Sequence, residues 1–431
     1  MLKLFIMQTP TSRVDLINQL AKQLKDLGII HRTSDENTVL DRTVKIEGKE
    51  LLNFTSCSYL GLENDARLKE AAMEAIKKYG VILSSSRAYL SVHLYEELEH
   101  LLSQVFSYPV VVTPTTTLGH FSLMPTVVNS EDAIILDHQV HASVQFAANM
   151  VGGMGAHLEM IRHNRMDYLE NRIKKLQSSY RKIWYMADGV YSMYGDTAPV
   201  AELKFLMDKY DSFHVYFDDA HGMSWMGKNG KGYVLSQILY HPKMVFITSL
   251  CKGFGTSGGA VVCYDDKIKE LVRNCGGTMI FSGPLQPGNL GAAVKSAEIH
   301  LSKEINERQE ALFYRIEYFK KKAIELNLPI VSKGETPIFF LGVGKPETAS
   351  NLCKKIMTKG FFTCIAVYPS VPYNHAGIRI MLNLHHSMED IDTLLDTLSK
   401  DFLKILEYEN TTIESIFDSF NINSNIIEMR S

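Results

Sequence analysis

The fold is decided by the stretch Val-Phe-Ile-Thr-Ser-Leu-Cys-Lys-Gly-Phe-Gly, residues 245–255, together with Phe-Asp-Asp-Ala-His, residues 217–221. Each stretch begins as an apolar run, which is typical of a buried strand, and then breaks into a polar turn. The two turns contain a carboxylate, an imidazole and an amine. We therefore expect these three groups to meet at the ends of two strands of one sheet.

Similar apolar runs recur through the middle of the chain, separated by stretches with helical periodicity such as 166–179. Seven runs with helical spacers predict an α/β fold with a mostly parallel seven-stranded sheet that is covered on both faces. Ligands of such sheets bind at the carboxyl ends of the strands. The predicted strands are Val110–Val112, Ala133–Asp137, Leu158–Arg162, Lys182–Asp188, His214–Asp218, Val245–Leu250 and Gly259–Tyr264.

The flanks of the chain predict a second, smaller domain. We expect the large domain to span 61–299 and a smaller α/β domain to span 300–410, with the segment 1–60 packed against the smaller one and 411–431 as a tail. The predicted elements of these flanks are a helix at Val14–Leu27, a hairpin at Thr43–Phe54 that turns at Gly48, a helix at Glu304–Leu326, strands at Pro337–Val343 and Gly377–Leu384, and a helix at Glu389–Glu407.

Composition excludes several classes of function. The 431 residues are 45% hydrophobic, which is enough for a large core, and the net charge is only −3. Scattered basic residues predict no nucleic-acid partner and no anionic membrane surface. The chain lacks a secretory signal pattern and a membrane-length apolar run, so we expect no membrane span and a cytoplasmic location. The six cysteines form no C-x-x-C pair, so neither a disulfide framework nor a metal site is predicted.

The residues of the two opening stretches suit pyridoxal 5'-phosphate (PLP). This cofactor needs a lysine for a Schiff base, a carboxylate for its pyridine nitrogen and a polar group for its ring oxygen. Lys252, Asp218 and His221 supply these groups. Taken alone, Asp218 or Asp219 could equally cap the segment that follows the strand. Lys252 alone could be an ordinary surface lysine. Their combination favours the cofactor.

Six motifs in order resemble the α-oxoamine synthase family of fold-type I PLP-dependent enzymes, over about residues 40–405. The resemblance implies the PLP-dependent transferase fold of type I. The motifs occupy residues 51–62, 84–87, 137–143, 189–199, 217–222 and 368–380.

The resemblance assigns roles at the cofactor. Lys252 is the Schiff-base lysine, Asp218 binds the pyridine nitrogen, and His221 binds the ring oxygen. His141 stacks on the ring, so Lys252, His141 and Asp218 form the expected catalytic set. A metal pair of His138 with His141 is the alternative for that histidine, but no further ligands accompany it.

The phosphate requires hydroxyl and amide donors. Thr115, Thr116 and Thr117 follow a predicted strand and can supply them at a helix N-terminus. The resemblance adds Ser249 as a phosphate donor and Ser192 as a further cofactor-binding residue of the same chain. It also implies that Ser282 reaches across a dimer interface, and therefore predicts a homodimer with a shared active site.

The predicted substrate residues are Arg379, Cys57 and Arg87. A guanidinium suits a substrate carboxylate, which is the role that the resemblance gives to Arg379. Several positions depart from the family pattern: Cys57 replaces an asparagine, Thr115 and Thr116 replace a glycine–aromatic pair, Gly283 replaces a threonine and Tyr95 replaces a histidine. These departures put the substrate in doubt and leave the cofactor unaffected.

The implied reaction condenses an amino acid with an acyl thioester of CoA or of acyl carrier protein. It usually proceeds with decarboxylation and gives an α-amino ketone. An aminotransferase or an aldolase/lyase on the same scaffold is the alternative, because both use the same lysine and aspartate. A catalytically silent partner subunit would lack Lys252. The amino acid stays open among glycine, alanine, serine and cysteate.

Overall fold

The computed structural model describes residues 12–36, 40–408 and 412–420, and their contacts divide the chain into two units. The large unit comprises 58–192 and 197–311. The small unit comprises the described residues up to Cys57, the segment Met193–Asp196 and the described residues from Leu312 onward. These units are defined by contacts within the structure, and the domain bounds predicted from the sequence remain predictions. The predicted tail lies largely outside the described residues, and its described part contains helix α15 (Ile413–Ser419).

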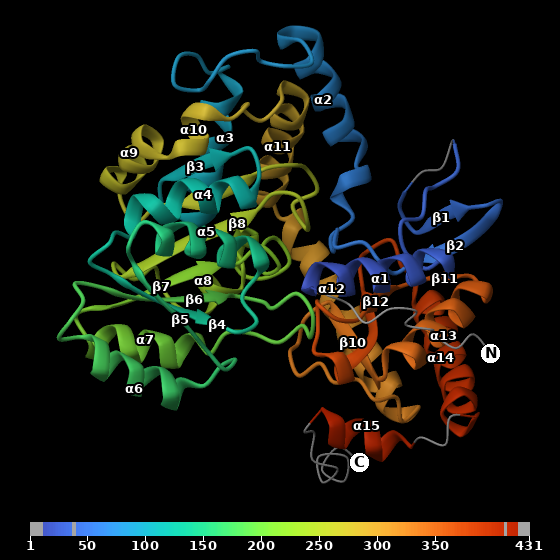
Figure 1. Cartoon of the computed structure of the whole chain (residues 1–431). Coiled ribbons are helices and arrows are strands. Elements are labelled where there is room, and N and C mark those ends of the chain that lie inside the picture. Colours follow the sequence, from blue (N-terminus) through green and yellow to red (C-terminus); the bar gives the residue numbers. More distant parts are fainter. Residues whose placement is uncertain (1–11, 37–39, 409–411, 421–431) are drawn as a thin grey trace. The chain divides into compact units, whose positions relative to one another are not determined.

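The large unit contains the predicted seven-stranded sheet, with the order β3-β9-β8-β7-β6-β4-β5 (Figure 1). Only β9 runs antiparallel to its neighbours, so the sheet is mostly parallel, as predicted. All seven predicted strands are confirmed, with shifts of a few residues at their ends. The strands are β3 (Val110–Thr113), β4 (Ala133–Asp137), β5 (His157–Ile161), β6 (Ile183–Asp188), β7 (Phe213–Asp218), β8 (Met244–Ser249) and β9 (Gly259–Val262).

Apolar side chains on both faces of the sheet explain why its strands read as continuous apolar runs. Val215 and Phe217 pack into the core on one face, whereas Tyr216 between them packs into the core on the other. Figure 1 shows α6 and α7 on one side of the strands and α4 and α5 on the other. The helices of this unit are η1 (Leu62–Asn64), α2 (Ala66–Tyr79), α3 (Leu94–Phe106), α4 (Thr116–Val127), α5 (Ala142–Gly153), α6 (Met166–Leu176), α7 (Val200–Lys209), η2 (Lys228–Gly230), α8 (Tyr233–Gln237), α9 (Asp266–Cys275), α10 (Gly277–Phe281) and α11 (Pro287–His300).

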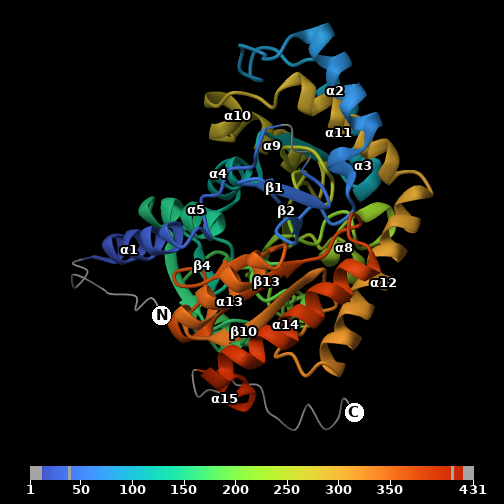
Figure 2. The same cartoon turned by 90° about the vertical axis from the view of Figure 1, so that its right-hand side faces the viewer.

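The small unit contains two three-stranded sheets, in the orders β1-β2-β11 and β10-β13-β12. The predicted hairpin is confirmed, and Gly48 at its turn has a φ of +76°, which glycine adopts without strain. Figure 2 shows α13 and α14 beside β10 and β13. The elements are α1 (Arg13–Asp26), β1 (Thr43–Ile46), β2 (Lys49–Asn53), α12 (Glu304–Glu325, which begins in the large unit), β10 (Ile338–Gly344), α13 (Pro346–Thr358), β11 (Phe361–Phe362), β12 (Cys364–Ala366), η3 (Tyr373–His375), β13 (Ala376–Met381) and α14 (Met388–Tyr408).

Residues 12–36, 40–408 and 412–420 contain neither a membrane-spanning helix nor a metal cluster. Within these ranges, no helix combines the length and the apolar character that crossing a membrane requires. The same residues contain no cluster of histidine, cysteine, aspartate and glutamate side chains suited to a metal ion, and their six cysteines are free.

Candidate active site

A pocket of about 140 Å³ opens where β6, β7 and β8 end and α4 begins. It gathers eight of the residues that the sequence predicts for the cofactor, and all of them belong to the large unit. The strand ends and the helix start explain this gathering, because the carboxyl ends of parallel strands meet at one edge of the sheet. The lining residues are Thr115, Thr116, Thr117, His141, Ser143, Asp188, Val190, Asp218, Ala220, His221, Ser249, Cys251 and Lys252.

Asp218 is the last residue of β7 and is almost completely buried. Its Oδ1 accepts a hydrogen bond from the backbone N–H of Ala220 at 3.0 Å, and its Oδ2 lies 2.9 Å from Nε2 of His120. Burial alone would raise the pKa of this carboxyl group. The charge and hydrogen bond of His120, together with the charges of His141 and Lys252, outweigh burial, and the pKa falls to about 2. Asp218 is therefore an ionised carboxylate inside the protein.

His120 is a residue of this site that the sequence analysis missed. It lies on α4, one turn beyond Thr116, and is fully buried. Its Nδ1 lies 2.8 Å from the hydroxyl of Tyr216, two residues before Asp218 on β7. A histidine within a buried helix that is otherwise mostly apolar is the only signal that the sequence offered.

Two further buried carboxyl groups flank Asp218. Asp188 ends β6 and is the cross-strand neighbour of Asp218. Burial, followed by the charge of Asp218, raises the pKa of Asp188 well above its usual range, and its Oδ1 accepts from the backbone N–H of His141 at 3.1 Å. Burial also raises the pKa of Asp219, whose Oδ2 accepts from the N–H of Val234. Of the adjacent pair 218 and 219, only Asp218 lines the pocket.

The two histidines of the pocket are each held by a local partner. Nδ1 of His221 lies 2.7 Å from the hydroxyl of Tyr59. His141 begins helix α5, and its Nδ1 accepts from the N–H of Ser143 at 3.3 Å. Burial lowers the pKa of His141, against the opposing charge of Asp218. A neutral ring whose Nδ1 is an acceptor carries its proton on Nε2.

Helix α4 begins at the pocket with the predicted threonines. Thr115 is its N-cap, and its hydroxyl accepts from the N–H of Leu118 at 3.0 Å. The first N–H groups of a helix have no partner within the helix, so this end suits an anion. A side chain in place of Gly259 would place its Cβ 2.7 Å from the backbone nitrogen of Thr116, so only glycine lets β9 approach the helix start so closely.

Ser249 and Lys252 follow the end of β8. Ser249 is buried, and its hydroxyl accepts from the N–H of Cys251 at 3.2 Å and lies 2.9 Å from the Cys251 sulfur. Lys252 is partly exposed and lines the same pocket. Cys251 was not among the predicted residues, although it lines the same pocket as the lysine.

Three predicted residues of the large unit do not line this pocket. Ser192 lies at the boundary of the unit, and Ser282 is the partly exposed C-cap of α10. Arg87 is buried: its guanidinium bonds to Glu99 at 3.0 Å and to the carbonyl of Val112 at 2.9 Å, and stacks on the ring of Tyr95 at 3.7 Å. These contacts give Arg87 a structural function, and its assignment to the substrate stays a prediction.

The remaining two predicted residues, Arg379 and Cys57, belong to the small unit and contact each other. Nη2 of Arg379, on β13, donates to the sulfur of Cys57 at 3.6 Å. Their assignment to the substrate stays a prediction.

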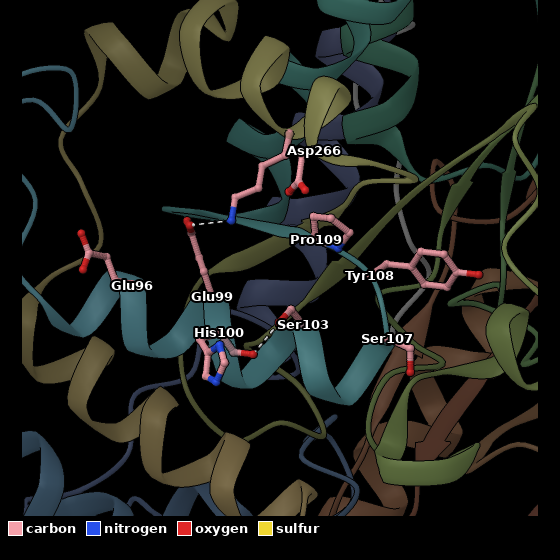
Figure 3. A pocket seen from close by; sticks show the side chains of 9 residues that line it. Glu96, Glu99, His100, Ser103, Ser107, Tyr108, Pro109 and Asp266 are labelled. Carbon is pink, nitrogen blue, oxygen red and sulfur yellow. Dashed lines mark hydrogen bonds and ion pairs between the residues drawn. The ribbon is translucent and has the colours of Figure 1, made fainter.

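A larger hollow of about 550 Å³ lies elsewhere in the large unit, between α3 and the start of α9. Figure 3 shows Glu96, Glu99 and His100 on the helix that forms one wall. Glu99 pairs with Lys269 at 3.6 Å, and His100 accepts from the hydroxyl of Ser103 through its backbone carbonyl. The lining lacks the combination of free amine, buried ionised carboxylate and hydroxyl loop, so the smaller pocket is the better candidate.

The sequence profile of the family described as aminotransferase class I and II matches residues 49–398. The 8-amino-7-oxononanoate synthase of Thermoanaerobacter pseudethanolicus is 32% identical over 390 residues, which cover 90% of this chain and 96% of that protein. The enzyme of the same name from Fervidobacterium nodosum is 32% identical over 362 residues, covering 83% and 90% of the two chains. The chain belongs to the α-oxoamine synthase family.

Solved structures of this family share the fold. A serine palmitoyltransferase from S. paucimobilis superimposes with a TM-score of 0.84 at 22% identity, over 92% of this chain and 99% of that one. An 8-amino-7-oxononanoate synthase from Francisella tularensis gives a TM-score of 0.68 at 22% identity, over 84% and 99%. The predicted type I fold of PLP-dependent transferases is therefore confirmed.

As an α-oxoamine synthase, the chain is a PLP-dependent acyltransferase that condenses an amino acid with an acyl thioester. The residues of the pocket fit the cofactor. The pocket contains one amine, one buried carboxylate that stays ionised, and a helix start with three threonines for a phosphate. These are the groups that a pyridinium ring, a lysine-linked aldehyde and a phosphate ester require.

Proposed function

We propose that this α-oxoamine synthase releases carbon dioxide after condensation and yields an α-amino ketone, with Lys252, Asp218 and His141 as its catalytic residues. One observation carries the roles of Lys252 and Asp218: a buried carboxylate with a pKa near 2 shares a small pocket with a lysine. The release of carbon dioxide is what the resemblance to the family implies. PLP, when bound, withdraws electrons from the substrate's α-carbon. An ionised Asp218 serves this purpose, because it keeps the pyridine nitrogen protonated.

Lys252 is proposed to hold the cofactor covalently and then to move a proton. With PLP bound, Nζ of Lys252 would accept the proton from the substrate's α-carbon and would return one after condensation. The partial exposure of Lys252 at the pocket supports this double use, because the side chain is not packed into the core.

His141 is proposed to cover one face of the cofactor ring and to donate through Nε2–H to the carbonyl oxygen of the thioester. Its lowered pKa and its Nδ1 acceptor contact with Ser143 support a neutral ring with this tautomer. His221, held by Tyr59, is proposed to donate to the ring oxygen. Thr115, Thr116, Thr117, Ser192 and Ser249 are proposed to bind the phosphate.

Arg379 is proposed to bind the carboxylate of the amino acid, and Cys57 to influence which amino acid is accepted. The contact between Nη2 of Arg379 and the Cys57 sulfur supports this pairing, because a change at Cys57 alters the surroundings of the guanidinium. We expect Arg379→Ala to raise KM for the amino acid roughly 10- to 100-fold, since a charge-assisted hydrogen bond is lost. Cys57→Asn should change the order in which the enzyme prefers amino acid substrates. Cys57→Ala distinguishes the effect of the size of this side chain from the effect of its polarity. An unchanged ranking in both variants would contradict the role of Cys57.

A homodimer with a shared active site is proposed, with Ser282 contributed to the partner. Exposed apolar side chains beside Ser282 support it. Tyr89 and Phe281 are each 88% exposed, and the segments that carry them are linked by a hydrogen bond from Ser86 to the carbonyl of Ile280. We name the set Val81, Ile82, Tyr89, Leu90 and Phe281 the apolar patch. Such a patch is typical of a protein–protein interface. A cytoplasmic location also stays a proposal.

The decisive experiment incubates the purified protein, loaded with PLP, with single amino acids and with acyl thioesters of CoA and acyl carrier protein of several chain lengths. Thiol release and carbon dioxide release are measured together. Equal amounts of both support the proposal. Thiol release without carbon dioxide would contradict decarboxylation. Conversion of an amino acid to a keto acid, with no thiol released, would indicate the aminotransferase alternative. Lys252→Ala is the matched negative control.

A further inference from the structure

Three buried side chains form a hydrogen-bonded row that leads inward from the pocket: Asp218, His120 and Tyr216. The tyrosine hydroxyl lies 2.8 Å from Nδ1 of the imidazole, and Nε2 lies 2.9 Å from Oδ2 of the carboxylate. Tyr216 and His120 are fully buried and Asp218 almost so. The geometry is set by two elements, because Tyr216 and Asp218 lie two residues apart on β7 and so share one face of the sheet, towards which α4 directs His120.

We propose that His120, supported by Tyr216, is a positioning residue that holds the Asp218 carboxylate ionised and correctly oriented for the pyridine nitrogen of the cofactor. This inference rests on the proposed role of Asp218 and adds a residue to it. His120 does not itself line the pocket but contacts Asp218, which does, so we expect it to act through Asp218.

The proton arrangement explains why a histidine suits this position. Burial raises the pKa of Tyr216 well above its usual range, so its hydroxyl remains neutral. A neutral hydroxyl can donate to Nδ1 or accept from an Nδ1–H. In both cases Nε2–H donates to Asp218. An asparagine or glutamine in place of His120 could donate a hydrogen bond to Asp218, but it would lack the second ring nitrogen that lies beside the Tyr216 hydroxyl.

Other charged groups also act on Asp218. His141 and Lys252, which line the pocket, lower its pKa together with His120. On the neighbouring strand, Asp188 interacts repulsively with it and has a raised pKa of its own. Of these groups, only His120 shares a side-chain hydrogen bond with the carboxylate among the described residues. Its removal should therefore change both the orientation of Asp218 and its ionisation.

Helix α4 gives the inference a second consequence. The helix that carries the threonines of the proposed phosphate site also carries His120, about one turn further along. Phosphate and pyridine nitrogen are the two ends of the cofactor. A single rigid helix therefore sets the distance between the two anchoring points, which a flexible loop could not do.

The test loads the apoprotein with PLP labelled with ¹⁵N at the ring nitrogen and records solid-state ¹⁵N NMR spectra from about pH 6 to about pH 9. The unaltered protein should show a protonated nitrogen throughout this range. In His120→Phe the signal should change to that of a non-protonated nitrogen as the pH rises. The dissociation constant of PLP should increase roughly 10- to 100-fold, as expected for the loss of a charge-assisted hydrogen bond.

Three companion variants sharpen the result. His120→Asn keeps one donor and should give an intermediate ¹⁵N response, which a purely structural role would not produce. Tyr216→Phe removes the partner of Nδ1 and should shift the titration in the same direction by less. His300→Asn is the matched control, because His300 is a fully buried histidine of the same unit that bonds to Ser224 and Ser296. It should leave the ¹⁵N signal unchanged.

Asp218→Asn distinguishes the two levels of the proposal. If Asp218→Asn loses the protonated signal but His120→Phe and His120→Asn retain it with PLP affinity within about twofold, the positioning role of His120 is wrong and the role of Asp218 stands. If Asp218→Asn also retains the protonated signal, the assignment of Asp218 itself fails. Should His120→Phe fail to fold, His120→Asn and Tyr216→Phe still decide the question. His120→Asn keeps a polar side chain at this buried position, and Tyr216→Phe keeps most of the side-chain volume.

Discussion

Lys252 is the residue on which the covalent attachment of the cofactor depends. We expect Lys252→Ala to lose the visible absorbance band of the lysine-bound cofactor, and to lose roughly 10²- to 10⁴-fold in kcat because no general base remains at the α-carbon. The spectrum of the purified protein and the thiol-release assay measure both effects. Lys269→Ala is the control, since Lys269 pairs with Glu99 at the larger hollow. A retained absorbance band in Lys252→Ala would assign the attachment to another residue.

Asp188 gives a prediction about the pH dependence of stability. Burial and the charge of Asp218 raise its pKa, so the folded chain keeps a proton that the unfolded chain releases above about pH 4. Stability therefore contains a contribution that declines as the pH rises from about 4 towards the folded-state pKa. Asparagine has no such proton. The melting temperature of Asp188→Asn apoprotein, relative to the unaltered apoprotein, should increase from about pH 5 to about pH 8.

The control for this prediction is Asp167→Asn. A hydrogen bond from Arg165 lowers the pKa of Asp167 to about 2, so this carboxyl group is ionised in the folded and the unfolded chain over the whole range. Its difference in melting temperature should not depend on pH there. A difference for Asp188→Asn that is equally flat would mean that Asp188 is ionised in the folded protein.

Single residues were predictable from the sequence where neighbouring residues in the chain make the function recognisable. Asp218, His221 and Lys252 are found because each lies in a short polar turn directly after a strand. His120 was missed because its partner lies about 100 positions away, and only the packing of α4 on the sheet brings them together. Asp188 lies at the end of a predicted strand. It neighbours Asp218 only because β6 and β7 are adjacent in the sheet, and the hydrophobic periodicity of the sequence does not determine the order of strands.

At the scale of an element, α4 must pack closely on the sheet. A Cβ added at Gly119 would lie 2.6 Å from Cδ1 of Ile247 and 3.0 Å from Oγ1 of Thr113. We expect Gly119→Ala to push the helix outward, to cost about 1–3 kcal/mol of unfolding free energy, and to weaken PLP binding because the threonines and His120 move with it. Thermal unfolding of the apoprotein and titration with PLP measure the two effects.

Gly153→Ala is the matched control for this prediction. Gly153 ends helix α5, and an added Cβ would meet no atom within 4 Å. The variant should have unchanged or slightly increased stability, because alanine favours helix over glycine. Equal loss of stability in both variants would mean that the close packing of α4 does not explain Gly119.

Elements were predictable where their apolar pattern is long. Each strand of the large sheet contains four to six residues, and their runs are continuous because both faces are covered. Strands β11 and β12 contain two and three residues, too few for a period to be recognised, and the sequence analysis did not find them. Their pairing with β2 and β13 defines them, and that information is not local.

At the scale of the whole molecule, the apolar patch predicts the oligomeric state. We expect Phe281→Asp to convert a dimer into a monomer, because a charge would have to be buried in the interface. Sedimentation velocity measures the mass. If Ser282 serves the partner's site, the loss of the dimer should also lower the activity. Phe205→Asp is the control, since Phe205 is also exposed but lies on α7. A protein that is monomeric before substitution would contradict the shared active site.

The small unit is built from segments that are far apart in the sequence, and this has a consequence for folding during synthesis on the ribosome. Strand β2, near the start, pairs with β11, which is made roughly 300 residues later, or about 15 to 60 seconds at ordinary translation rates. The large unit is complete once residue 311 has left the ribosome, whereas the first hairpin must wait for its third strand. A nascent chain stalled at that stage should show the large unit resistant to protease and the N-terminal hairpin cleaved.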